Sequence, residues 1–158
     1  MKYLKIFEEF TKFQLDEITR SEFMEYHRVK ETELKPSGEY PSEILFDKSK
    51  LLKIKSLLPK NYHFAYGSTW FTIEYFYESE YNEGVFKKIA VDKVRQEDDE
   101  PFYTLQFFYE ISKGDKVNDQ YKFYRFEESD FEEICDNPQV LLDYLDKNIM
   151  TNEPPKNI

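Results

Sequence analysis

Cysteine, histidine and glycine are scarce in this chain of 158 residues, which has one, two and four of them. A single cysteine cannot form an internal disulfide, which agrees with a reducing compartment. Four glycines leave no glycine-rich phosphate loop. Neither His27 nor His63 has a second histidine or a cysteine at the spacing of a zinc site. We therefore expect a cytoplasmic protein with no metal and no cofactor.

Long apolar runs are also missing. No stretch of about 18 apolar residues occurs, which argues against a membrane span. The opening residues reach Glu8 and Glu9 too early for the apolar region of a signal peptide. The length suits one domain with its own hydrophobic core. We expect a single domain over residues 1–150 and a frayed tail over residues 151–158, which contain Pro154 and Pro155.

Aromatic residues are abundant, with 15 Phe and 13 Tyr. AT-rich codon usage is one explanation of this excess, and an aromatic binding surface is the other. Aromatic and β-branched residues alternate with polar ones in a way that predicts strands. The predicted strands cover residues 69–78, 85–94, 102–111 and 121–126, with 62–66 as a candidate first strand. The last three links are too short for a crossover helix, so these strands should form an antiparallel meander.

Apolar residues at helical spacing, together with capping residues, predict the helices. These cover residues 3–13 (where a strand over 3–7 is the alternative), the stretch around Phe23–Tyr26, residues 47–58, and two segments after Ser129 and Asn137. The last segment carries the stripe Leu141, Leu142, Leu145 and Ile149. Residues 31–43 read as a loop. The predicted fold class is α+β: an antiparallel meander of four to five aromatic-rich strands with N-terminal helices and a C-terminal helix packed on one face.

Charge is unevenly spread along the chain. The net charge is −10, and residues 61–158 hold 21 acidic against 10 basic side chains. An acidic surface repels phosphate backbones and anionic membranes. We therefore expect no direct nucleic-acid binding and no membrane binding, and we expect a basic protein as partner.

Two acidic clusters could contact such a partner. The first is Glu127, Glu128, Asp130, Glu132 and Glu133, and the second is Glu97, Asp98, Asp99 and Glu100. The alternative for both is an ordinary solvated surface, with acids favoured at a helix start. In a simple meander we expect the two clusters at opposite ends of the strand over 102–111, as two separate patches. The first cluster is the denser, and we take it as the partner-binding site.

Candidate catalytic residues are few. Glu33-Leu34-Lys35 has the spacing of a nuclease triplet but falls in a predicted loop. Cys135 lies on an apolar helix face, where a small core residue is the ordinary reading. No nucleophile has a histidine at a local, motif-like spacing. We therefore expect no enzymatic activity and assign no catalytic residues.

The opening Met1-Lys2-Tyr3-Leu4-Lys5-Ile6-Phe7-Glu8-Glu9-Phe10 resembles the start of many small proteins in tailed-phage and mobile-element genomes. Those chains often end in a Leu-Leu-x-x-Leu helix, and here Leu141-Leu142-Asp143-Tyr144-Leu145 stands near the C-terminus. In size and acidity the chain is similar to bacterial immunity proteins and phage-encoded inhibitors. These resemblances imply a small accessory, inhibitor or immunity-type protein and transfer no catalytic residues.

Three functional hypotheses follow. The first is a non-enzymatic acidic protein that neutralises a basic protein partner. The second is a structural or virion-associated protein that self-assembles, and homodimerisation through aromatic strand faces would serve it. The third, a small enzyme with unrecognised residues, is opposed by the scarcity of histidine, glycine and cysteine.

Overall fold

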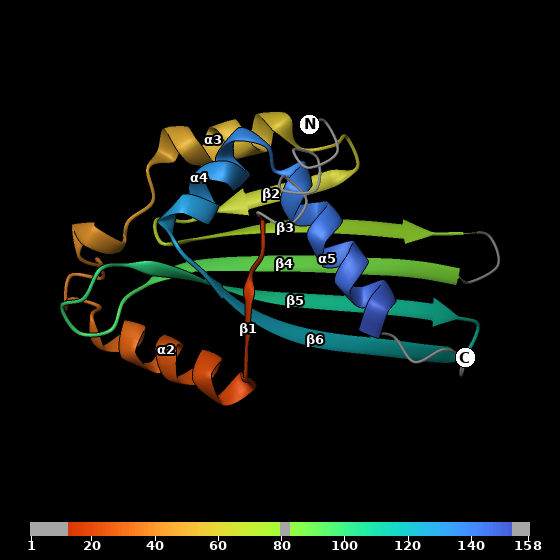
Figure 1. Cartoon of the computed structure of the whole chain (residues 1–158), viewed down its shortest axis with the longest axis horizontal. Coiled ribbons are helices and arrows are strands. Elements are labelled where there is room, and N and C mark those ends of the chain that lie inside the picture. Colours follow the sequence, from red (N-terminus) through yellow and green to blue (C-terminus); the bar gives the residue numbers. More distant parts are fainter. Residues whose placement is uncertain (1–12, 80–82, 153–158) are drawn as a thin grey trace, which may run out of the picture.

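The computed structural model describes residues 13–79 and 83–152. In these ranges the fold is α+β, with a six-stranded antiparallel sheet and four α-helices (Figure 1). The strands are β1 (Asp16–Ile18), β2 (Tyr62–Tyr66), β3 (Trp70–Glu78), β4 (Glu83–Val94), β5 (Phe102–Lys113) and β6 (Lys116–Phe126). The helices are α2 (Arg20–Thr32), α3 (Lys48–Leu57), α4 (Glu128–Asp136) and α5 (Gln139–Asn152), with a short 3-10 helix over Ser42–Ile44.

The sheet has the order β1-β6-β5-β4-β3-β2, so the strands from β2 to β6 form the predicted meander. The predicted strand count was too low because β1 is an additional edge strand. It pairs with β6 from Asp16 opposite Arg125 to Ile18 opposite Phe123. Three residues are too few to show a periodic pattern, and Thr19 then caps α2 and turns the chain away from the sheet.

One face of the sheet carries the hydrophobic core. Side chains of α3, α4 and α5 join it, and α4 and α5 lie over the strands in Figure 1. From α5, Leu141, Leu142, Leu145 and Ile149 are buried in the same cluster as the inward residues of β3 to β6. Burying each such side chain contributes about 1.5–3 kcal/mol, so this layer supplies a large part of the stability.

The other face of the sheet receives α2. Its Phe23 ring lies 4.8 Å from the ring of Phe123, and its Lys30 ammonium lies 2.8 Å from Asp92. Phe123 and Asp92 point away from the core because the residues next to each of them point into it. The expectation that the helices pack on one face is therefore wrong for α2. This helix also runs to Thr32, into the segment predicted as a loop.

The two ends of the chain lie only partly in the described ranges. The predicted helix over residues 3–13 falls outside them except for Phe13, which is buried against Tyr144 with ring centroids 5.7 Å apart. At the other end α5 runs to Asn152, two residues into the predicted tail. The remaining tail lies outside the described residues.

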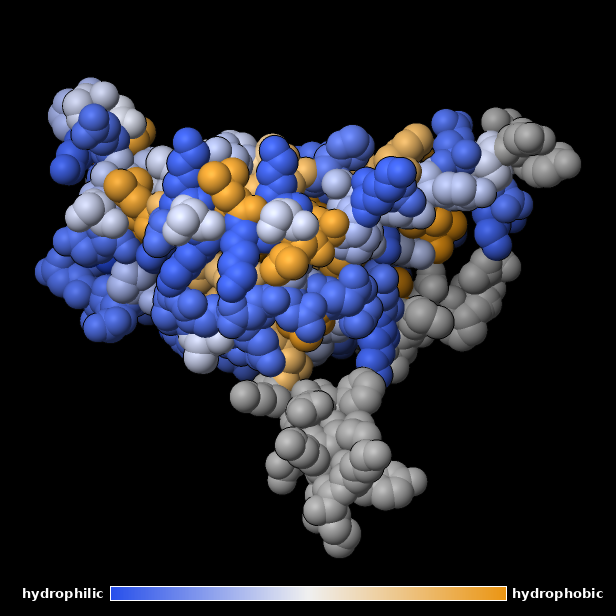
Figure 2. Space-filling model, turned by 90° about the horizontal axis from the view of Figure 1, so that it is seen from above, coloured by the Kyte–Doolittle hydropathy of each residue, from blue (hydrophilic) through white to orange (hydrophobic). Residues whose placement is uncertain are grey.

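Hydrophilic side chains dominate the side of the molecule seen from above in Figure 2, with separate apolar spots between them. Leu52 and Leu57 of α3 are apolar side chains that are both more than two-fifths exposed. Within the described ranges, no helix is long and apolar enough to cross a lipid bilayer.

Candidate binding surfaces

The first acidic cluster surrounds the start of α4, and four of its five acids have side-chain partners within the described chain, Glu133 being the exception. Asp130 accepts a hydrogen bond of 3.1 Å from the backbone N–H of Glu127 and so caps the helix. Glu127 pairs with Arg125 at 3.3 Å. Glu128 accepts a hydrogen bond of 2.5 Å from the hydroxyl of Tyr103. The contacts give these carboxylates structural roles in addition to their charge.

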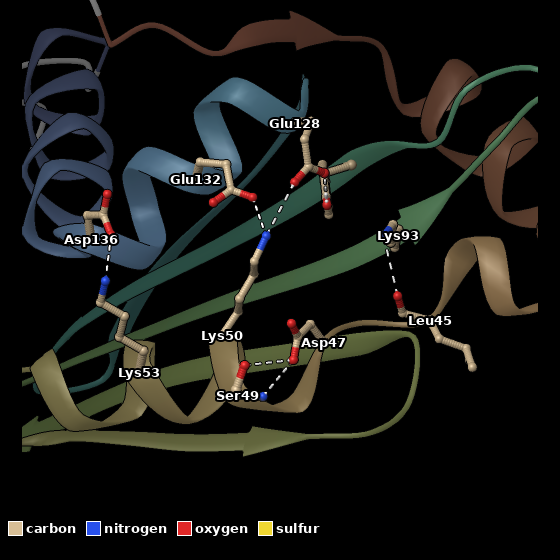
Figure 3. A network of polar contacts seen from close by, with 10 residues as sticks. Leu45, Asp47, Ser49, Lys50, Lys53, Lys93, Glu128, Glu132 and Asp136 are labelled. Atoms are coloured by element: carbon tan, nitrogen blue, oxygen red, sulfur yellow. Dashed lines mark hydrogen bonds and ion pairs between the residues drawn. The ribbon is translucent and has the colours of Figure 1, made fainter.

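Lys50 of α3 is the main cation facing this cluster (Figure 3). Its ammonium contacts Glu132 and lies 3.9 Å from Glu128. The hydrogen bond from Lys50 holds the pKa of Glu132 below its usual value, and the same bond raises the pKa of Lys50. Lys53 pairs with Asp136 at 2.6 Å one turn further along both helices. These pairs join α3 to α4 and reduce the negative charge available to a partner.

The second acidic cluster forms the tip between β4 and β5, which we call the acidic loop (Glu97, Asp98, Asp99 and Glu100). All four side chains are exposed, and within the described part of the chain none of them forms an ion pair. The neighbouring Arg95 forms its ion pair with Glu33, at 2.7 Å, and not with an acid of the loop. Arg95 also attracts Asp98 electrostatically without forming an ion pair, so the protein neutralises the charge of the acidic loop only in small part.

Both acidic clusters lie at the same end of the sheet, and the expectation of opposite ends is wrong. Tyr103 at the start of β5 pairs with Phe126 at the end of β6. Strand direction alternates in a meander, so the link before β5 and the chain after β6 emerge together. This end of the sheet therefore combines the acidic loop with the start of α4.

A third surface lies on the sheet face that α2 partly covers, which we call the second sheet face. It is the half of that face that α2 leaves open. Four rings form a row across it, with centroids 6.5, 5.8 and 4.7 Å apart in sequence. We call it the aromatic row: Phe76 of β3, Phe86 of β4, Phe108 of β5 and Tyr121 of β6. Phe76 is 62% and Tyr121 is 54% exposed, whereas core rings such as Phe71 and Phe107 are almost fully buried. Rings this exposed on neighbouring strands typically mark a contact surface.

Acidic side chains border the aromatic row. Glu110 and Asp119 stand directly opposite each other on β5 and β6, and Glu110 is also opposite Phe86. Across the row, Glu74 stands opposite Lys88. None of these four residues forms an ion pair within the described chain. Like charges opposite each other in a sheet cost stability, so the Glu110–Asp119 pair favours a cation beside it.

The remaining candidate residues have structural surroundings. His27 lies 3.1 Å from the hydroxyl of the buried Thr104, and His63 is exposed on the edge strand β2. Glu33 of the nuclease-like triplet pairs with Arg95 at the end of α2. Burial raises the pKa of the Cys135 thiol to about 12, so this thiol is not an activated nucleophile.

The aromatic row was only partly visible in the sequence. Side-chain alternation puts Phe76 of β3 and Phe108 of β5 on the strand faces opposite to the predicted core residues. The sequence therefore indicates aromatic rings on both faces of the sheet. The position of α2, which decides which half of that face stays open, has no such signal.

No protein-family model, curated protein or solved structure matches this chain.

Proposed function

We propose that this protein is a non-enzymatic binding protein that captures a basic protein partner at the acidic end of its sheet. The observation that carries the proposal is the acidic loop, whose four carboxylates are exposed and unpaired within the described chain. The acids at the start of α4 add to the negative potential there, although Lys50 and Arg125 offset part of it.

Charge supports a role in capture. Complementary charges raise the association rate and reject partners of the wrong sign, and salt weakens both effects. The net charge of −10 acts in the same direction at long range. We therefore place the proposed binding surface at the acidic loop and not at the start of α4, where four of the five acids have internal partners.

A matched pair of charge variants tests the proposal. The loop variant is Asp98→Asn, Asp99→Asn and Glu100→Gln, and the control is Glu83→Gln, Asp115→Asn and Asp143→Asn. Both remove three negative charges from exposed positions, but the control positions lie away from the acidic loop. Glu97, whose φ of 50° lies in the left-handed region, is left unchanged so that each variant removes three charges.

Binding of a labelled decalysine peptide, measured by fluorescence anisotropy at low salt, gives the comparison. We expect the loop variant to bind at least about threefold more weakly than the control. Equal affinities would mean that only net charge matters, and the proposal would then fail. The basic products of neighbouring genes are the first natural partners to examine with the same two variants.

A further inference from the structure

The open half of the second sheet face is a surface that the acidic loop does not explain. The aromatic row spans β3 to β6, and α2 covers the same face only as far as Phe123, Thr104 and Asp92. Three strand spacings of about 4.8 Å give the aromatic row a length of about 14 Å across the sheet, and β5 continues for five residues beyond Phe108, which is about 16 Å along the strand. A single α-helix with side chains is about 10–12 Å across, so one helix would fit beside α2.

The size of this surface argues against a stable dimer through it and leaves room only for a weak contact between two copies. An aromatic side chain buries about 150–250 Å² when it is fully covered. Phe76 and Tyr121 are a little over half exposed, while Phe86 and Phe108 are half-buried. The row therefore offers a few hundred Å² of ring surface, whereas a stable protein interface buries about 800 Å² on each partner.

Charge argues in the same direction. Glu74, Glu110 and Asp119 border the row, and Lys88 is the only described cation that the sheet register places among them. A second copy would bring the same acids onto this face and repel the first. Lysine or arginine would instead meet the unpaired acids and the rings together, because aromatic faces attract cations.

The chain itself contains this mode of recognition. The guanidinium of Arg125 lies 3.7 Å from the centre of the Phe102 ring, and the ammonium of Lys87 lies 4.9 Å from that of Tyr75. On the second sheet face, Phe23 of α2 packs against the ring of Phe123, and Lys30 of α2 pairs with Asp92. A helix that combines aromatic and cationic side chains therefore already packs on one half of this face.

We propose that the aromatic row is a docking site for an amphipathic helix of a partner protein. The helix would carry an apolar stripe flanked by lysine or arginine. This inference rests on the proposed function only for the sign of the partner's charge, and it uses a different surface. The apolar stripe would cover Phe76 and Tyr121, and the basic flank would meet Glu110 and Asp119.

The probe is a 14-residue peptide of leucine and lysine with leucines at positions i, i+3, i+4 and i+7. Its controls are a scrambled peptide of the same composition and a version with glutamate in place of lysine. The test variant is Phe76→Ser with Tyr121→Ser, and the matched variant is Leu52→Ser with Leu57→Ser on α3. All four positions are exposed, so the fold should tolerate each change.

We expect the Phe76→Ser, Tyr121→Ser variant to bind the peptide at least about tenfold more weakly. Aromatic anchors supply most of the binding energy of such interfaces, and this variant removes two of them. The α3 variant should bind like the wild type, and the scrambled and glutamate peptides should bind weakly. Amide chemical shifts should change along β3 to β6 around the row. Neutralising the acidic loop should leave this binding nearly unchanged, which separates this test from that of the proposed function.

Three results would overturn the inference. One is equal peptide binding by the wild type and the Phe76→Ser, Tyr121→Ser variant. Another is tight binding of the glutamate peptide, which would remove the role of charge. The third is a dimer at about pH 7.5 that disappears in the same variant, because the face would then belong to a second copy.

Discussion

At the residue scale, the second sheet face brings charged and titratable groups together beneath α2. His27 lies 3.1 Å from Thr104 and 4.0 Å from Asp92, and Lys30 is 5% exposed between Asp92 and the carbonyl of Thr69. Removing Asp92 alone would leave the Lys30 ammonium buried without its carboxylate. These contacts give α2 its place on the sheet although few of its residues are apolar.

The surroundings of His27 predict a pH dependence of stability. Burial lowers its pKa below the ordinary 6.5, Lys30 adds to this, and Asp92 and Glu31 oppose it. Between the lowered pKa and about 6.5, the unfolded chain binds a proton that the folded chain does not. Stability should therefore fall as the pH drops below about 6.5, and this contribution is fully present above that value.

Urea unfolding at about pH 7.5 and about pH 5.5 measures this effect. We expect the wild type to lose more stability over this range than His27→Gln, which removes the titrating group. His63→Gln, at an exposed position, is the matched control and should keep the wild-type slope. An identical pH dependence for His27→Gln and the wild type would contradict the prediction.

At the scale of the elements, α5 is attached to the sheet by its apolar stripe. Leu145 is fully buried beside Ile73, Ile89 and Phe107. Leu145→Ala should lower the free energy of unfolding by about 2–5 kcal/mol, because it removes buried methyl groups and leaves a cavity. Leu52→Ala on α3 makes the same chemical change at a position that is 43% exposed, and it should cost far less. Chemical denaturation of both variants decides the matter, and similar losses would count against the packing.

The elements that could be predicted are those with local signals. The strands from 62–66 to 121–126 show period-two alternation and polar links, and the Asp47 cap and Pro59 enclose α3. The residues that place α2 are Phe23, His27 and Lys30, spaced four and three apart, but two of them are polar. A search for apolar periodicity therefore sees only the start of this helix and not the face on which it lies.

The candidate site shows the same limit. The composition indicated negative charge and the sequence located both acidic clusters, but ion pairs between distant segments are not visible in it. Lys50 and Glu132 are 82 residues apart, and their contact removes Glu132 from the free acids. The two clusters lie at the same end of the sheet and not at the predicted opposite ends, because strand direction reverses at each turn from β4 to β6.

At the scale of the whole molecule, charge decides whether the aromatic row can bring two copies together. At neutral pH the net charge of −10 and the acids beside the row keep copies apart. Near the isoelectric point of about 4.8 the repulsion due to net charge disappears, while the exposed rings remain. The protein should therefore be monomeric at neutral pH and should self-associate through the aromatic row near its isoelectric point.

Sedimentation velocity at about pH 7.5 and about pH 5 tests this. We expect a monomer at the higher pH and a reversible dimer at the lower, with circular dichroism showing that the fold is kept. Phe76→Ser with Tyr121→Ser should stay monomeric at both, because the rings that drive association are gone. Leu52→Ser with Leu57→Ser should still dimerise, since those side chains lie on α3. If the Phe76→Ser, Tyr121→Ser variant also dimerised near pH 5, association would have to use a surface other than the aromatic row.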